Sequence, residues 1–214
     1  MIALKYDGGV LMAADTLLSY GSLAKWPNIP RIKILGENCA ICFTGDYADF
    51  QDLTKEIENV IHNDLVFEDG ESMTPPQLFS WVQRTLYSKR SDFEPYLCQL
   101  ILIGHHNGEP FLGSVDDIGT RWTEDYAGTG YGAHIAVPML RRALDGRQEP
   151  LSRAEAVRVL EDCLRTIFYR ECRAINKFQI ADAANGKVTI GDPFTLPTTW
   201  DFEGFSFEKT AIIR

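Results

Sequence analysis

An aspartate and an arginine stand at the ends of two predicted strands, where their charges could serve a reaction or the fold. Asp15 ends the apolar run 10–14, and Arg31 opens the alternating run 31–35. A carboxylate beside a guanidinium can be the remnant of a catalytic site or a structural ion pair, because both arrangements look alike in sequence. A guanidinium keeps its proton in proteins, so Arg31 cannot act as a base. We interpret the two residues as a buried or half-buried ion pair that holds two hairpins together.

The cysteines and histidines are placed poorly for binding a metal. Cys39 and Cys42 form a CxxC pair within a predicted strand, where residues i and i+3 point to opposite faces. His105 and His106 are adjacent in a predicted turn, so their side chains diverge and we expect both to be solvated. No second pair of cysteines or histidines stands at zinc spacing. The sequence therefore predicts core cysteines and no metal site.

A glycine-rich segment, 128–133, matches the G-x-G-x-x-A pattern of dinucleotide sites. Such a site needs a strand on each side of the helix that follows the glycines, and an acidic residue after the second strand. Here a second predicted helix follows the first. We therefore expect a tight turn between a strand and a helix, whose glycines permit close packing, and no cofactor.

The composition is that of a globular protein with reduced thiols. The chain has 214 residues, of which 45% are hydrophobic and 24% charged, which excludes disorder, collagen and coiled coil. Its net charge of −9 argues against nucleic acids and anionic membranes as partners. No apolar run approaches the roughly 18 residues of a membrane helix, and no secretory signal is visible. Five scattered cysteines favour the cytoplasm or nucleus.

Apolar patterns predict strands that come in hairpins. Turns such as Asn185-Gly186 join them, and glycine there adopts positive φ without a steric penalty. The stretch 16–30 has no such pattern and contains several breakers, so we expect it to loop. Strands are expected over 2–6, 10–14, 31–35, 39–43, 97–103, 110–115, 121–126, 179–184 and 187–190.

Four helices are expected, in two pairs. Apolar residues recur at helical spacing over 50–61, and the segment 133–144 forms another helix. The pairs Thr74/Gln77 and Ser152/Glu155 are capping boxes that begin the other two. The order ββ, ββ, αα, βββ, αα, ββ predicts an α+β fold, because hairpins make antiparallel sheets and paired helices cover them. We expect a four-layer αββα sandwich with the helix pairs outside.

Several motifs resemble proteasome beta-type subunits, which belong to the N-terminal-nucleophile hydrolase superfamily. The similar places are the hairpin that ends in Ala13-Ala14-Asp15, the basic residue Arg31, the junction Thr44-Gly45-Asp46 and the helix exit Tyr169-Arg170-Glu171. Further blocks resemble the eukaryotic beta-7 type of these subunits, namely 19–24, 45–51, 87–91, 127–133 and 176–180. The resemblance covers almost the whole chain and implies the αββα fold.

The resemblance also implies a chemistry whose residues are replaced here. Catalytic beta subunits cut peptide bonds with an N-terminal threonine, whose hydroxyl attacks while the free α-amine serves as base. Asp15 matches the family's strand-end aspartate, and Gly45 matches the glycine that stabilises the oxyanion. Arg31 replaces the catalytic lysine, Glu171 replaces an aspartate, and Ala174 replaces a serine. The resemblance thus implies a degenerate site in a non-catalytic subunit.

Two alternatives remain open. Counting back from Asp15, Met1 falls two places inside the threonine position, and Ile2 has neither a hydroxyl nor a thiol. The chain could therefore be a catalytic N-terminal threonine endopeptidase whose nucleophile is missing from the given start. It could also be a free-standing enzyme or binding protein of the same fold.

The resemblance implies a place in a large particle. A beta-7-type subunit contributes to beta-ring assembly and ring docking in the 20S core particle, in cytoplasm and nucleus, and thereby to ubiquitin- and ATP-dependent proteolysis by the whole complex. Expected partners are beta-6-type and beta-1-type subunits in the same ring, beta-type subunits in the opposite ring, and alpha-type subunits. We interpret the basic residues Arg84, Lys89 and Arg90 as a solvated helix face or as contacts with neighbouring subunits.

The C-terminal residues hold more apolar surface than a solvated tail usually does. We expect residues 1–192 to form one beta-type domain and 193–214 to form an arm. The arm could pack on its own domain or on a partner, and the resemblance favours contact with the opposite ring. The predicted interface residues are Trp200, Phe202, Phe205, Phe207, Ile212 and Ile213.

Overall fold

The computed structural model describes residues 1–66 and 73–201, and its main strands form two five-stranded sheets. Sheet I has the order β10-β1-β2-β11-β12 and sheet II the order β5-β6-β7-β8-β9. All pairings are antiparallel, as hairpins require. Sheet I consists of β1 (Ile2–Tyr6), β2 (Gly9–Asp15), β10 (Tyr126–Gly128), β11 (Phe178–Ala184) and β12 (Lys187–Ile190). Sheet II consists of β5 (Ile32–Leu35), β6 (Cys39–Gly45), β7 (Cys98–His106), β8 (Glu109–Val115) and β9 (Arg121–Thr123).

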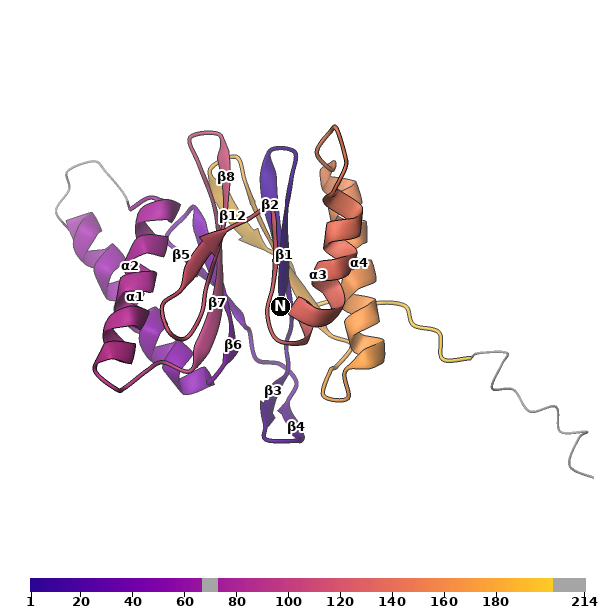
Figure 1. The fold of residues 1–214 in the computed structure, drawn as a ribbon, viewed down its shortest axis with the longest axis horizontal. Coiled ribbons are helices and arrows are strands. Elements are labelled where there is room, and N and C mark those ends of the chain that lie inside the picture. Colours follow the sequence, from indigo (N-terminus) through magenta and orange to yellow (C-terminus); the bar gives the residue numbers. More distant parts are fainter. Residues whose placement is uncertain (67–72, 202–214) are drawn as a thin grey trace, which may run out of the picture.

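Two pairs of helices cover the outer faces of the sheets (Figure 1). Helices α1 (Tyr47–Val66) and α2 (Pro75–Ser91) lie on sheet II, and α3 (Tyr131–Leu144) and α4 (Arg153–Arg170) lie on sheet I. The predicted α+β fold, a four-layer αββα sandwich, is confirmed. None of the described helices is both long and apolar enough to cross a membrane.

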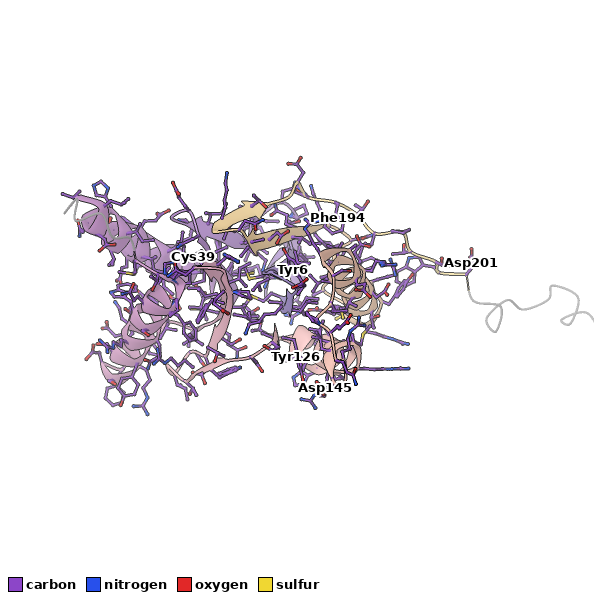
Figure 2. The ribbon with its side chains drawn as sticks, turned by 90° about the horizontal axis from the view of Figure 1, so that it is seen from above. Tyr6, Cys39, Tyr126, Asp145, Phe194 and Asp201 are labelled. Carbon is purple, nitrogen blue, oxygen red and sulfur yellow. The ribbon has the colours of Figure 1, made fainter. Side chains whose placement is uncertain are left out.

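Three apolar cores separate the four layers, and strand β2 contributes to two of them. Val10 and Met12 face sheet II, whereas Leu11 and Ala13 face α3 and α4. A strand that is covered on both faces needs apolar residues at successive positions, which explains the continuous run 10–14. Figure 2 shows the side chains that fill the spaces between sheets and helices.

The two cysteines of β6 belong to different cores, as predicted. Cys39 packs toward α1 and α2, and Cys42 lies between the sheets. Burial raises the pKa of both thiols, to about 12 for Cys39, because the thiolate would lose its hydration. Both therefore stay protonated at neutral pH. Among the described residues, no group of three or more His, Cys, Asp or Glu side chains is placed to hold a metal ion.

Both predicted capping boxes begin helices. The Thr74 backbone N–H donates to Gln77 Oε1 at 2.8 Å, and the Ser152 N–H donates to Glu155 Oε2 at 2.9 Å. Each side chain satisfies a backbone donor that has no partner within the helix. The starts of α2 and α4 are therefore encoded locally.

The prediction that residues 16–30 only loop is wrong. Strands β3 (Leu18–Tyr20) and β4 (Leu23–Trp26) pair as a separate small sheet, with a turn at Gly21, whose φ is +58°. These strands are three and four residues long and mostly exposed, so they leave no apolar alternation in the sequence. Arg173 Nη1 donates to the Gly21 carbonyl at 3.1 Å and ties the hairpin to the exit of α4.

Two other expectations are wrong because they depend on distant parts of the chain. The single extension expected over 121–126 is divided, since β9 stays in sheet II while β10 crosses to sheet I and pairs with β1. His105 is buried rather than solvated, and its Nδ1 accepts a hydrogen bond from the Gly186 N–H at 2.9 Å. That partner lies in the β11–β12 turn, which local sequence cannot reveal.

The first residues of the predicted C-terminal arm pack on the domain. Phe194 pairs with Phe178 of β11, and Leu196 is buried against α4. The Asn176 side chain bonds both the N–H and the C=O of Leu196, at 2.9 and 2.7 Å. The boundary predicted at 192/193 thus divides residues that pack together. Thr199 and Trp200 also contact α4, so an arm remains a prediction only for residues beyond Trp200. Figure 2 shows Phe194 beside the sandwich and Asp201 beyond its edge.

Candidate functional site

An open cleft of about 990 Å³ lies where β2, β6 and α4 end. Its lining includes the five positions that the sequence singled out, namely Asp15, Arg31, Gly45, Glu171 and Ala174. These positions come from two sheets and from the exit of one helix. The αββα fold brings all five together at one end of the sandwich. The roles proposed for them remain a prediction.

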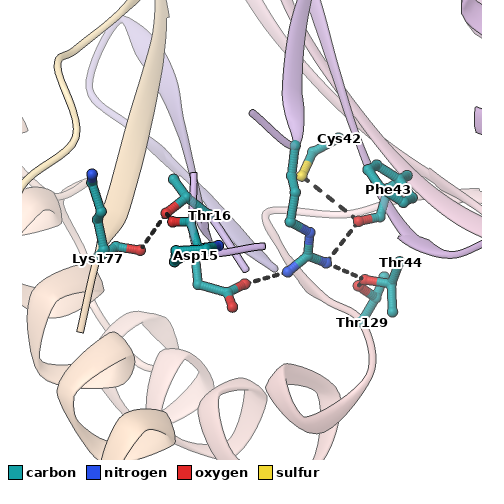
Figure 3. Close-up of polar contacts among 9 residues, drawn as sticks. Asp15, Thr16, Cys42, Phe43, Thr44, Thr129 and Lys177 are labelled. Atoms are coloured by element: carbon teal, nitrogen blue, oxygen red, sulfur yellow. Dashed lines mark hydrogen bonds and ion pairs between the residues drawn. The ribbon is translucent and has the colours of Figure 1, made fainter. Parts of the chain in front are cut away.

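The Arg31 guanidinium is held on several sides (Figure 3). Its Nη1 pairs with the Asp15 carboxylate, and its Nη2 donates to the Phe43 carbonyl at 2.8 Å and to Thr44 Oγ1 at 3.3 Å. The side chains of Arg31 and Asp15 are only 13% and 22% exposed, so water screens the pair weakly. The predicted ion pair between two hairpins is present, and it connects β2 to β5 and β6.

Two threonines that the sequence analysis did not single out extend this network. Thr44 Oγ1 lies 2.7 Å from Thr129 Oγ1, and the Thr129 N–H donates to the Met1 carbonyl at 3.1 Å. Thr44 stands beside Gly45 in the junction that leads into α1. Its place in that motif was the only feature of the sequence that could have indicated its role in the network. The guanidinium that donates to Thr44 cannot take its proton, so this contact does not activate the hydroxyl for attack.

Gly45 is required by the backbone whether or not it serves a reaction. Its φ is +129°, a conformation that side chains disfavour. A Cβ here would also collide with the Leu97 carbonyl. The glycine that matches the family's oxyanion position is therefore explained by packing alone.

The turn into α3 closes another side of the cleft. A Cβ at Gly132 would come within 2.7 Å of the Met1 carbonyl, and one at Gly128 within 2.8 Å of Val137 Cγ2. Gly130 precedes α3 with φ of +55°. The prediction that these glycines permit close packing between strand and helix is confirmed.

Glu171 ends α4 and brings a second carboxylate into the cleft. Partial burial raises the pKa of this carboxyl, and the negative charge of Asp15 adds to the effect. Ala174, three residues later, presents only a methyl group. The described helix exit thus offers one carboxyl with a raised pKa and no hydroxyl at the position where the family has a serine.

The described lining of the cleft contains no lysine. Lys33, two residues after Arg31, points toward α1 instead and pairs with Glu58 at 2.9 Å. His134 also lines the cleft and is exposed. The described lining has two arginines, Arg31 and Arg173, of which Arg31 is paired with Asp15. A guanidinium stabilises its surroundings and accepts no proton.

Comparisons with known proteins agree on one family. A family described as "Proteasome subunit" matches residues 1–183. "Proteasome subunit beta type-4" of Arabidopsis thaliana is 38% identical over 205 residues, which cover 96% of this chain and 82% of the relative. The Xenopus laevis protein of the same name is 36% identical, with 94% and 83% covered. "Proteasome subunit beta type-7" of Saccharomyces cerevisiae is 29% identical, with 98% and 84% covered.

Proposed function

The chain belongs to the proteasome subunit family as a beta-type member, and from this premise we propose that it is a structural subunit that does not itself cut peptide bonds. The observation that carries the proposal is the state of Arg31. The resemblance places a catalytic lysine at this position, and the arginine here is bonded to Asp15, the Phe43 carbonyl and Thr44. Such a side chain cannot exchange a proton with a nucleophile.

Two more replacements support the proposal. Ala174 cannot orient an amine or a hydroxyl by hydrogen bonding, and Glu171 is one methylene longer than the aspartate that it replaces. These replacements lie far from the start of the sequence. A threonine supplied ahead of Met1 would therefore still meet a cleft without its lysine and serine partners.

Covalent labelling tests the proposal directly. Purified particles that contain this subunit are treated with an epoxyketone-type probe, and each subunit is analysed by intact mass. We expect adducts on catalytic beta subunits, which serve as the internal positive control, and none on this chain. An adduct on this chain would establish the alternative, a catalytic threonine endopeptidase, and end the proposal.

We further infer that the subunit is of the beta-7 type. The plant and frog relatives carry the type-4 name and the yeast relative the type-7 name, yet all three align with nearly the whole chain. The blocks 19–24, 45–51 and 87–91 support the beta-7 type. Under this inference the neighbours are beta-6-type and beta-1-type subunits in the same ring and alpha-type subunits above, in cytoplasm and nucleus.

The C-terminal residues are proposed to contact the opposite ring. Trp200 is 66% exposed and stacks edge-on against Tyr169 and Phe168 at 4.9 and 5.8 Å. The other predicted interface residues, Phe202, Phe205, Phe207, Ile212 and Ile213, lie outside the described residues. Trp200 therefore packs on the end of α4, and contact with the opposite ring is proposed for the residues that follow it.

A further inference from the structure

Strands β3 and β4 form a hairpin with little to hold it together by itself. The strands are three and four residues long, and residues 20–28 are all exposed. The hairpin projects from one end of the sandwich (Figure 1). Because an isolated two-stranded hairpin is at best marginally stable in water, the order of this one depends on its contacts with the rest of the chain.

Hydrogen bonds tie the hairpin to one connection, residues 171–177 between α4 and β11. Arg173 Nη1 donates to the Gly21 carbonyl at 3.1 Å, and Lys177 Nζ donates to Asn28 Oδ1 at 2.6 Å. At the base of the hairpin, the N–H of the buried Thr16 donates to the Lys177 carbonyl at 3.1 Å. Its hydroxyl contacts the same carbonyl (Figure 3). The connection thus holds the hairpin at both its turn and its base.

The C-terminal segment 193–200 holds the same connection from another side. Asn176 stands next to Lys177, and its side-chain amide accepts from the Leu196 N–H at 2.9 Å and donates to the Leu196 carbonyl at 2.7 Å. Leu196 itself is buried in the core that α4 shares with sheet I. Asn176 is therefore the residue at which the C-terminal segment meets the support of the hairpin.

The connection and the hairpin both form part of the cleft wall. Glu171 and Ala174 line the cleft from the connection, and Leu18 and Ser19 line it from the hairpin. A loss of order at 171–177 therefore reaches the hairpin and this wall of the cleft together.

We propose that the connection 171–177 couples the order of the C-terminal segment to the order of the β3–β4 hairpin, with Asn176 as the positioning residue. The physical basis is one continuous hydrogen-bond network that both segments share. A partner that restrains the C-terminal residues then stiffens the hairpin and the cleft wall. This last consequence rests on the proposed function, whereas the coupling itself is a property of the single chain.

Hydrogen exchange of the purified full chain, read by mass spectrometry, tests the coupling. The variant Asn176→Ala removes both bonds to Leu196 and none of the described hydrogen bonds of the hairpin. We expect faster exchange in 193–200 and also, by about threefold, in the hairpin amides of 17–29. Since coupling is reciprocal, Lys177→Met, which removes the bond to Asn28, should speed exchange in 193–200 as well.

Tyr169→Phe is the matched control, because it also removes a bond from the C-terminal segment. That bond joins the Thr199 N–H to the Tyr169 hydroxyl on α4 and bypasses the connection. We expect this variant to speed exchange in 198–201 and to leave the hairpin unchanged. An equal effect of Tyr169→Phe and Asn176→Ala on the hairpin would refute the role of Asn176.

Two other results would overturn the coupling. One is a hairpin whose exchange Asn176→Ala leaves unchanged, and the other is an equal rise in α1 and β7, which would mean a general loss of stability. These outcomes are read in the free chain, so they do not judge the proposed function, which fails instead if the epoxyketone probe labels this chain. Within particles, the hairpin of the Asn176→Ala chain should exchange faster than that of the wild type, and equal protection would refute transmission from the partner.

Discussion

At the residue scale, the Asp15–Arg31 ion pair lies in the cleft at low exposure. If the pair mainly joins β2 to β5 and β6, its two members must depend on each other energetically. We expect Asp15→Asn and Arg31→Met each to lower the free energy of unfolding by about 1–3 kcal/mol, because each leaves the other group poorly paired at low exposure.

The double variant tests whether the two side chains are energetically coupled. Asp15→Asn/Arg31→Met should cost clearly less than the sum of the two single variants, by at least about 1 kcal/mol. Denaturant unfolding of the four proteins measures the coupling. Additive losses would mean that the two side chains stabilise the fold independently and that the ion pair does not join the hairpins.

A second prediction at this scale concerns Glu171. Its pKa is raised in the folded protein, so the folded state holds the proton more tightly than the unfolded chain does. The carboxyl therefore contributes stability below its unfolded pKa, near 4.3. That contribution is lost as the pH rises through the folded pKa.

The variant Glu171→Gln isolates this contribution, because the amide does not titrate. Relative to the variant, the wild type should lose stability as the pH rises from about 4 to 7. Thermal melting across this range provides the measurement, and Glu149→Gln, at an exposed position between α3 and α4, is the control. A wild-type advantage that grows with pH would show that the sign assigned to Glu171 is wrong.

At the scale of elements, the sequence predicts what is determined locally. The apolar run of β2 and the capping boxes of α2 and α4 each contain their own signal. The β3–β4 hairpin has three- and four-residue strands with little buried surface, so its pattern is absent from the sequence. The switch between β9 and β10 is set by pairing with β1, more than a hundred residues earlier.

The candidate site was predictable in part for the same reason. The correspondence of Asp15, Arg31, Gly45, Glu171 and Ala174 with one family site came from the resemblance, since no local rule brings all five together. The contact between Thr44 and Thr129 spans 85 positions and depends on how sheet II approaches the turn before α3. Hydrogen bonds of this kind follow from the tertiary fold, so neither residue could be assigned beforehand.

At the scale of the whole molecule, the cleft and the scaffold are separable. Three apolar cores hold the four layers together, and the glycines and the ion pair of the cleft have packing roles of their own. The scaffold therefore does not need a reaction at the cleft in order to persist. What a structural subunit must retain is its shape and the surfaces that face its neighbours.

The C-terminal residues provide a prediction at this largest scale. Deletion of 202–214 removes none of the contacts described for residues 1–201, including those of Leu196 with Asn176. If these residues contact the opposite ring, as proposed, the purified chain should melt within about 1 °C of the full chain, since a change of 1 kcal/mol would shift the melting temperature by about 2–4 °C. Pairing of the two rings should weaken, because the deletion removes five of the predicted interface residues.

Native mass spectrometry of the particles measures that pairing through the proportion of half-particles to complete ones. A chain in which 202–214 are replaced by an equally long Gly/Ser segment separates the effect of the side chains from that of chain length. Both altered chains should accumulate half-particles if apolar side chains make the contact. Complete particles at the wild-type level would show that the arm does not join the rings, whereas a lowered melting temperature would show that it packs on its own domain.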